Sequence, residues 1–255
     1  MRLLAAALPT LTALTALSAC SDATDSDRSQ VVEPDNQVVE SPERQPRSVE
    51  TSASSPRPEP RPLVVRGIDV SHHQGAITWD RVADDGISFA YLKATEGSTF
   101  TDPRLTANWA GAKRAGLEVG GYHYFTLCSP PEAQADHFVA TLNALGADRR
   151  SLPPVVDLEL IGNCDPPPER SAVLASATTF IERVEAATGR KVVVYFHPDF
   201  EAKYSLVDAL DRRLWVRRVG PTPPPGEWWM WQRSDRTRVA GIATPVDLDV
   251  RRERP

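Results

Sequence analysis

The sequence has 255 residues, which is enough for one large domain or two small ones, and its 41% hydrophobic content provides for a sizeable core. A formal net charge of −5 without a long basic run argues against a nucleic-acid-binding protein. Five histidines and three cysteines are too few and too scattered for a Cys/His zinc cluster, so we predict neither a metal nor another cofactor.

The first twenty residues predict an export signal. Met1-Arg2 followed by the apolar, alanine-rich run Leu3–Ala19 is typical of a secretory signal segment. Its end, Leu17-Ser18-Ala19-Cys20, resembles the lipobox of bacterial lipoproteins, where cleavage leaves the cysteine lipidated. The alternatives are ordinary cleavage with an incidental cysteine, or an uncleaved helix of marginal length for a bilayer. We predict lipidation at Cys20 and an exported protein anchored in the bacterial cell envelope, on the periplasmic or outer-membrane side.

Residues 21–62 predict a disordered tether. They are rich in Ser, Pro, Glu, Asp and Arg, contain no aromatic residue and show no sustained periodicity. Such a segment buries too little apolar area to offset its chain entropy. As a coil of about forty residues it would span roughly 35 Å. The folded domain is therefore expected over residues 63–255.

Apolar, strand-like runs alternate with helical segments from Leu63 onward. The expected strands are 64–70, 89–94, 119–125, 154–160, 192–196, 214–216, 228–232 and 246–250, and the expected helices are 79–84, 105–115, 131–145 and 170–188. This alternation predicts parallel strands with crossover helices. Eight strands predict one closed α/β barrel, in which the last three strands lack full helices between them. Active sites of such barrels lie at the C-terminal ends of the strands.

Two carboxylates are set into the apolar fourth strand, Pro153-Pro154-Val155-Val156-Asp157-Leu158-Glu159-Leu160. Side chains two residues apart on a strand share a face, so Asp157 and Glu159 are expected side by side. Buried carboxylates are costly, which favours a paired-carboxylate site over an unused pair. The alternative is a strand end that reaches solvent, where both acids are hydrated.

Two further acids are expected on the same rim. Asp69 closes the first strand and Asp247 lies in the last, and these strands are neighbours in a closed barrel. Although a lone strand-end aspartate is commonly a turn or cap residue, four acids on one rim favour a functional cluster. Aromatic residues fall near the same rim, either as barrel core or as platforms for sugar rings: Tyr122, Tyr124, Tyr195, Trp228, Trp229 and Trp231.

An Asp/His metal site is the main chemical alternative. His72 and His73 follow Asp69, and His123 lies on the third strand. Adjacent residues at a strand end point in opposite directions, so a polar loop explains His72 and His73 better.

A disulfide between Cys128 and Cys164 is also expected. These cysteines follow the third and fourth strands, whose loops should be neighbours, and an exported protein meets oxidising conditions.

Five motifs together resemble the glycoside hydrolase family 25 lysozymes over about residues 66–251. They are Gly67-Ile68-Asp69-Val70-Ser71-His72-His73-Gln74-Gly75, Lys93-Ala94-Thr95-Glu96-Gly97, Gly121-Tyr122-His123-Tyr124, Pro154-Val155-Val156-Asp157-Leu158-Glu159 and Val246-Asp247-Leu248-Asp249. The resemblance implies a TIM-like (β/α)5β3 barrel that hydrolyses the β-1,4 bond between N-acetylmuramic acid and N-acetylglucosamine.

The resemblance also implies roles for individual residues. Glu159 would be the general acid with Asp157 as its close partner, and Asp69 and Asp247 would shape the charge and hold the substrate. The expected substrate-binding residues are Lys93, Tyr122, Tyr195 and Trp231. His73, where the family often has an aromatic residue, and the arginine-rich sixth strand are departures that affect substrate contacts.

The expected protein is thus a membrane-anchored lysozyme acting on peptidoglycan glycan strands. The alternative is a non-catalytic glycan-binding lipoprotein that kept the barrel. The presence of all four acids favours the enzyme, since a binding module needs no proton donor.

Overall fold

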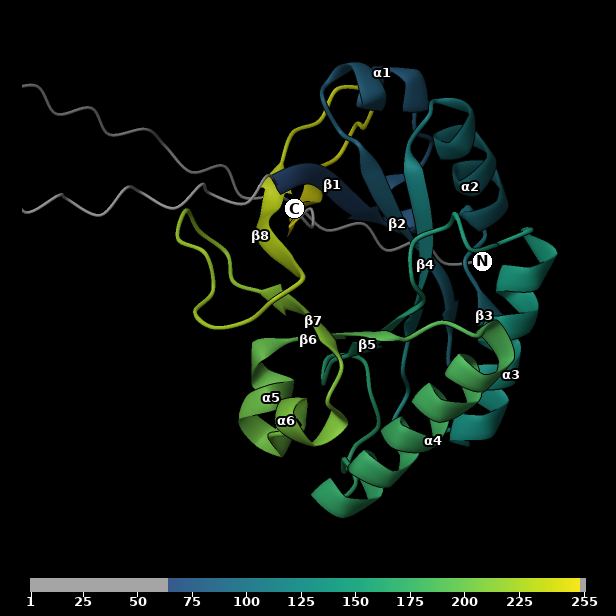
Figure 1. Ribbon diagram of the computed structural model, residues 1–255, viewed down its shortest axis with the longest axis vertical. Coiled ribbons are helices and arrows are strands. Elements are labelled where there is room, and N and C mark those ends of the chain that lie inside the picture. The colour runs from purple at the N-terminus through teal and green to yellow at the C-terminus, as the bar shows by residue number, and fades with distance from the viewer. Residues whose placement is uncertain (1–63, 253–255) are drawn as a thin grey trace, which may run out of the picture. The chain divides into compact units, whose positions relative to one another are not determined.

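Strands and helices alternate along residues 64–252, the part of the chain that the computed structural model describes (Figure 1). The strands are β1 Val64–Val70, β2 Phe89–Glu96, β3 Phe100–Thr101, β4 Glu118–Tyr124, β5 Val155–Leu158, β6 Val193–Phe196, β7 Arg213–Arg217, β8 Met230–Thr237 and β9 Val246–Arg252. The helices are η1 His72–Gln74, α1 Trp79–Asp84, α2 Leu105–Arg114, α3 Pro131–Ala144, α4 Arg170–Thr188, α5 Pro198–Tyr204 and α6 Val207–Leu210. The predicted signal segment, Cys20 and the predicted tether lie outside the described residues.

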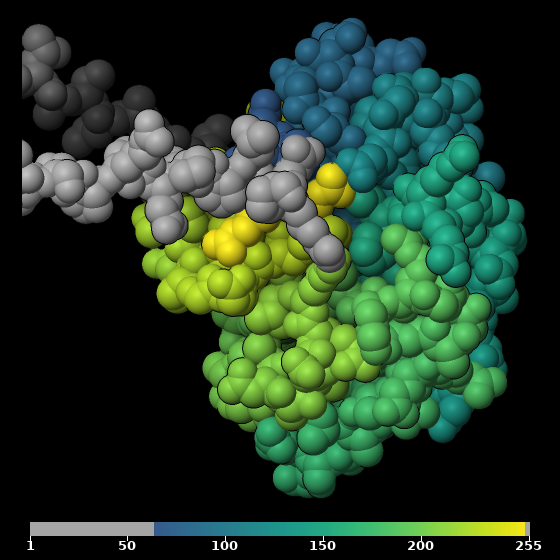
Figure 2. All heavy atoms as spheres, viewed as in Figure 1, coloured from purple at the N-terminus to yellow at the C-terminus, as the bar shows by residue number. Residues whose placement is uncertain are grey.

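The strands close into an irregular α/β barrel of eight strands, which confirms the predicted fold. Their order is β1-β9-β8-β7-β6-β5-β4-β2, and pairing of β1 with β2 completes the ring. The short β3 was not predicted; it pairs only with the end of β2, as an antiparallel extension outside the ring. β1 also pairs with β9 on its other side, and Figure 2 shows yellow C-terminal residues and blue residues from the start of the described chain on one face of the domain.

The last strand runs against the others. β9 is antiparallel to both β1 and β8, so the prediction of parallel strands throughout was wrong at this position. The reason is the connection from β8, residues 238–245, which is shorter than the roughly dozen residues that a parallel crossover needs. The beginning of β9, not its end, therefore lies beside the C-terminal ends of the other strands.

Alternation along the strands separates two apolar layers. Val156 and Leu158 belong to the layer between the strands and the helices, where α3 and α4 pack side by side (Figure 1). The layer inside the barrel contains Phe89, Tyr91, Leu152, Val155, Val193, Tyr195, Trp215 and Met230. These large side chains fill the barrel interior away from the C-terminal ends of the parallel strands. The polar inward residues therefore gather at those C-terminal ends.

Helix ends agree with the local sequence. Gly189 ends α4 with a positive φ of 65°, a conformation that favours glycine. None of the helices between residues 64 and 252 combines the length and apolarity needed to cross a bilayer.

Candidate active site

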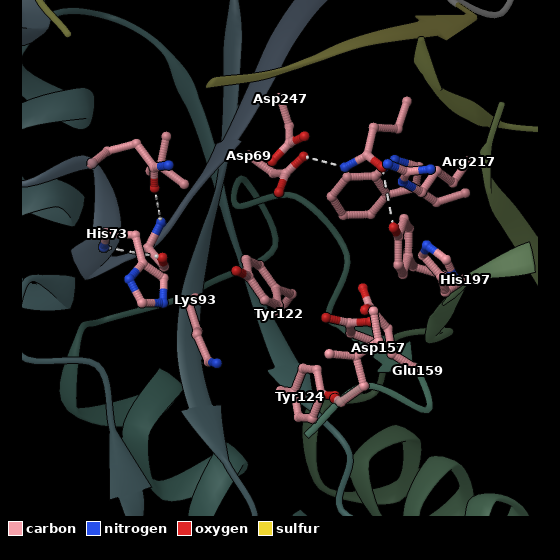
Figure 3. Close-up of a pocket in the computed structure, with 17 residues that line it drawn as sticks. Asp69, His73, Lys93, Tyr122, Tyr124, Asp157, Glu159, His197, Arg217 and Asp247 are labelled. Atoms are coloured by element: carbon pink, nitrogen blue, oxygen red, sulfur yellow. Dashed lines mark hydrogen bonds between the residues drawn. The ribbon is translucent and has the colours of Figure 1, made fainter. Parts of the chain in front are cut away.

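A cleft of about 390 Å³ opens at the C-terminal ends of the parallel strands. It lies above the aromatic layer inside the barrel, and Figure 3 shows its lining side chains converging from both sides. The lining residues are Asp69, Val70, Ser71, His73, Gln74, Lys93, Tyr122, Tyr124, Asp157, Glu159, Ile161, Tyr195, His197, Trp215, Arg217, Gln232 and Asp247. All four predicted acids are among them.

Asp157 and Glu159 lie together on one wall of the cleft (Figure 3). Asp157 projects inward from β5 and is 7% exposed, while Glu159 follows the strand's last residue and is partly exposed. Burial raises the pKa of Asp157 well above its ordinary value, and the charge of Glu159 raises it further. Burial also raises the pKa of Glu159, although the nearby His197 and Arg217 act in the opposite direction. The pair therefore retains protons at higher pH than solvated carboxyls do.

Asp69 and Asp247 lie side by side, because β1 and β9 pair these two residues directly. Burial raises the pKa of Asp69 to about 6, even though Gln232 donates a hydrogen bond to its carboxylate at 3.0 Å. Burial and the neighbouring charge of Asp69 raise the pKa of Asp247 to about 8. The prediction that barrel closure brings these acids together is confirmed.

A fifth acid, Asp249, lies one inward position deeper on β9 and was not assigned a role from the sequence. It is fully buried, and the Trp215 indole donates to its Oδ1 at 2.9 Å. Burial and the charge of Asp69 raise its pKa well above the ordinary value. The sequence could have indicated that Asp249 also faces the barrel interior, because it lies two residues after Asp247 and such residues share a strand face.

Hydrogen bonds fix the orientation of the Gln232 side chain. Its Oε1 accepts from the Tyr195 hydroxyl at 3.1 Å, so its amide nitrogen is directed to Asp69. This chain of contacts links β6, β8 and β1 across the barrel.

Basic side chains face the acids from two sides of the cleft. Lys93 on β2 contacts Glu96 at 2.5 Å and lies over the Tyr124 ring, 4.8 Å from its centroid. On the other side, Arg217 on β7 is paired with Asp235 at 2.8 Å. The cleft thus combines proton-holding carboxyls with fixed positive charges.

Three of the four predicted substrate-binding residues line the cleft: Lys93, Tyr122 and Tyr195. The prediction for Trp231 was wrong. Its ring is 3% exposed and packs with Trp228 and Val250 in a cluster separate from the barrel interior, and its indole donates to the Arg218 carbonyl. The next residue, Gln232, occupies the inward position instead, because neighbouring residues on a strand face opposite sides.

Sequence reasoning did not identify Gln232 and His197 as cleft residues, and it noted Trp215 and Arg217 only as part of the arginine-rich sixth strand. Trp215 and Arg217 are two residues apart on β7, so strand alternation could have identified them once the inward face was known.

Cys128 and Cys164 form a disulfide with a Cα–Cα distance of 5.9 Å, which confirms the predicted pairing. The bridge joins the loops after β4 and β5, the second of which begins with Glu159. The Tyr124 hydroxyl adds a contact to the Ile161 carbonyl in the same loop. The segment that positions Glu159 is therefore held at several points.

The histidines do not support a metal site. His123 faces away from the cleft, where its ring hydrogen-bonds Thr95 and Gln134 and stacks on Phe180. His72 pairs with Asp102 at 2.8 Å. Among residues 64–252 no cluster of three or more His, Cys, Asp or Glu has a geometry suited to a metal ion.

Comparisons with known proteins agree with this architecture. The model of "Glycosyl hydrolases family 25" matches residues 68–242. Lysozyme M1 of Streptomyces globisporus is 36% identical over 201 residues, which span 72% of this chain and 66% of that protein. A family 25 glycosyl hydrolase from Bacillus anthracis superposes with a TM-score of 0.68 at 31% identity, covering 74% of this chain and 89% of that one. A bacterial lysozyme from Streptomyces coelicolor gives 0.65 at 34% identity, covering 72% and 90% respectively. This chain is therefore a member of glycosyl hydrolase family 25.

Proposed function

We propose that this protein is a muramidase that hydrolyses the β-1,4 bond between N-acetylmuramic acid and N-acetylglucosamine in peptidoglycan. The observation that carries the proposal is the wall of the cleft formed by Asp157 and Glu159. Glycoside hydrolysis needs a carboxylic acid that still holds its proton at working pH and can give it to the leaving oxygen. Burial and like charge raise the pKa of both residues toward that condition.

We assign the general acid to Glu159 and the role of its close partner to Asp157. A proton donor must touch the glycosidic oxygen, and Glu159 is the more accessible of the two side chains. Asp157 is deeper, and its Oδ1 is buried without a hydrogen-bond partner among the described residues, so it is free to bind a polar group of the sugar. Asp69 and Asp247 hold the substrate across the cleft, together with Lys93.

Analysis of fragments released from purified peptidoglycan tests the proposal. After borohydride reduction, mass spectrometry should find reduced muramic acid at the new chain ends. Reduced glucosamine at those ends would contradict the bond assignment. Binding to peptidoglycan without any release of fragments would instead support a non-catalytic glycan-binding lipoprotein.

We further propose that the protein is exported and anchored in the cell envelope by a lipid on Cys20. The support is the Leu17-Ser18-Ala19-Cys20 sequence after an apolar segment, followed by a long polar stretch before the domain. This arrangement would hold the enzyme near its polymeric substrate while the stretch provides reach.

A further inference from the structure

Four pairs of basic residues that are far apart in the sequence meet at the end of the barrel opposite the cleft. We call their eight side chains the basic surface: Arg149, Arg150, Arg190, Lys191, Arg212, Arg213, Arg251 and Arg252. Three pairs lie just before or at the start of β5, β6 and β7, near the N-terminal ends of parallel strands, with residues 151–154 between Arg150 and β5. The fourth pair ends β9, which reaches the same end because it is antiparallel.

The basic surface is hollowed. One hollow of about 750 Å³ is lined by five basic side chains and one acid, Asp211. An adjoining hollow of about 530 Å³ is lined by six basic side chains and one acid, Glu118. Arg149, Arg190 and Arg213 line both hollows, so the two form one continuous positive region. This concentration of charge contrasts with the net charge of −5 of the whole chain.

Neighbouring acids neutralise only part of this charge. Glu185 pairs with Lys191 and Arg212, Glu118 pairs with Arg251, and Glu227 lies 3.7 Å from Arg252. Arg149, Arg150 and Arg213 are exposed, and their side chains have no ion-pair or hydrogen-bond partner within residues 64–252.

The unpaired cations repel their neighbours. Burial lowers the pKa of the Arg190 guanidinium; the charge of Asp148 acts in the opposite direction, and the positive charge of Arg149 adds to the lowering. A bound anion would relieve this repulsion, so the hollows favour an anionic partner.

Two further features indicate a membrane surface. Trp229, which is partly exposed, lines the second hollow beside Arg251, whose guanidinium lies 5.8 Å from the tryptophan ring centroid. Tryptophan is favoured at the boundary between lipid headgroups and water. In addition, Val64 pairs with Arg252, so the segment that leads from Cys20 joins the domain at this same end.

We propose that the basic surface docks on the anionic phospholipid headgroups of the membrane that holds the anchor. The docked domain would direct its cleft away from the lipid. A tether confines the domain near the membrane at a high effective concentration, so weak electrostatic contacts suffice for docking. The predicted anchor on Cys20 matters to this proposal only because it would raise the local concentration of the domain at the membrane. The basic surface itself belongs to the folded domain.

Vesicle sedimentation of residues 21–255, which lack both the apolar signal segment and Cys20, tests the docking without an acyl chain. The probes are vesicles of equal parts phosphatidylglycerol and phosphatidylcholine, compared with vesicles of phosphatidylcholine alone. We expect binding to the anionic vesicles to exceed binding to the neutral ones and to weaken as salt is added. Combined Arg149→Gln, Arg150→Gln and Arg213→Gln should reduce the binding constant by about 100-fold, at about 5-fold per charge removed.

The matched control combines Arg81→Gln, Arg104→Gln and Arg236→Gln, which remove the same charge from exposed positions outside the basic surface. Thermal unfolding checks that both triple variants are folded, and lysine at the same three basic-surface positions should restore binding. Equal binding to both vesicle types, or equal loss in the control variant, would overturn the proposal. Retention by soluble polyphosphate without binding to anionic vesicles would also overturn it, in favour of a polymeric anion.

Discussion

Replacing the candidate substrate-binding acid Asp247 with asparagine should stabilise the fold at neutral pH. The carboxyl is mostly buried and accepts no hydrogen bond from any residue between 64 and 252, so Asp247→Asn loses no native contact of that kind. The substitution keeps the shape of the side chain. It removes a charge that burial and Asp69 disfavour.

The size of the effect follows from the pKa of Asp247, which rises from an ordinary value of 3.8 to about 8 in the folded protein. Between these two values the native state binds more protons than the unfolded state, so stability falls as pH rises through the window. The part of this window that lies below pH 7 corresponds to about 4 kcal/mol. Because the cleft is open to water, we expect the variant to be more stable by about 1–3 kcal/mol at pH 7.

Urea unfolding of the wild type and Asp247→Asn at several pH values measures this difference. The two free energies of unfolding should be similar near pH 3, where both side chains are neutral, and should diverge up to about pH 8. Asp84→Asn, at an exposed position, is the matched control and should show no comparable divergence. A difference that is independent of pH, or a variant that is less stable at pH 8 than the wild type, would refute the reasoning.

Three further predictions concern the catalyst, the disulfide and the anchor. Glu159→Gln should lower the rate of peptidoglycan cleavage by about 10²–10⁴-fold because glutamine carries no transferable proton. The control Glu182→Gln, on the exposed face of α4, should not lower the rate. A folded Glu159 variant with near wild-type rate would mean that the general acid is misassigned. Replacing Cys128 and Cys164 with serine should cost about 3–4 kcal/mol of stability, measured by urea unfolding, given the 36-residue separation; an unchanged midpoint would contradict this estimate. Cys20→Ala should abolish labelling by a fatty-acid analogue, and equal labelling of both proteins would exclude lipidation at that residue.

The sequence allowed prediction of the features that depend on the alternation of strands with helices and on the closure of the strands into a ring. Runs of β-branched residues between helical segments indicated the strands, and a closed ring required the first strand to meet the last. That requirement made the strands of Asp69 and Asp247 neighbours, whereas the direct pairing of the two acids also depends on the antiparallel direction of β9. Asp157 on β5 and Glu159 directly after it were predictable because a buried apolar run rarely contains two carboxylates without a use for them.

Features that depend on strand register were not predictable to the same degree. A shift of one residue exchanges the two faces of a strand, which is why Trp231 was expected in the cleft where Gln232 lies. The direction of β9 depends on the short connection before it rather than on its own residues. Asp249 acquires its environment from Trp215 and Asp69, which come from two other strands, so its burial could not be deduced from its local sequence.

The antiparallel last strand also has a consequence for protein engineering. Because Val64 pairs with Arg252, the two ends of the described domain are adjacent and leave the barrel opposite the cleft. A short linker could join them, which makes the domain suitable for circular permutation or for insertion into a surface loop of another protein. Fusion partners attached at either end would leave the cleft unobstructed, so the domain could be moved between proteins without redesign of the cleft.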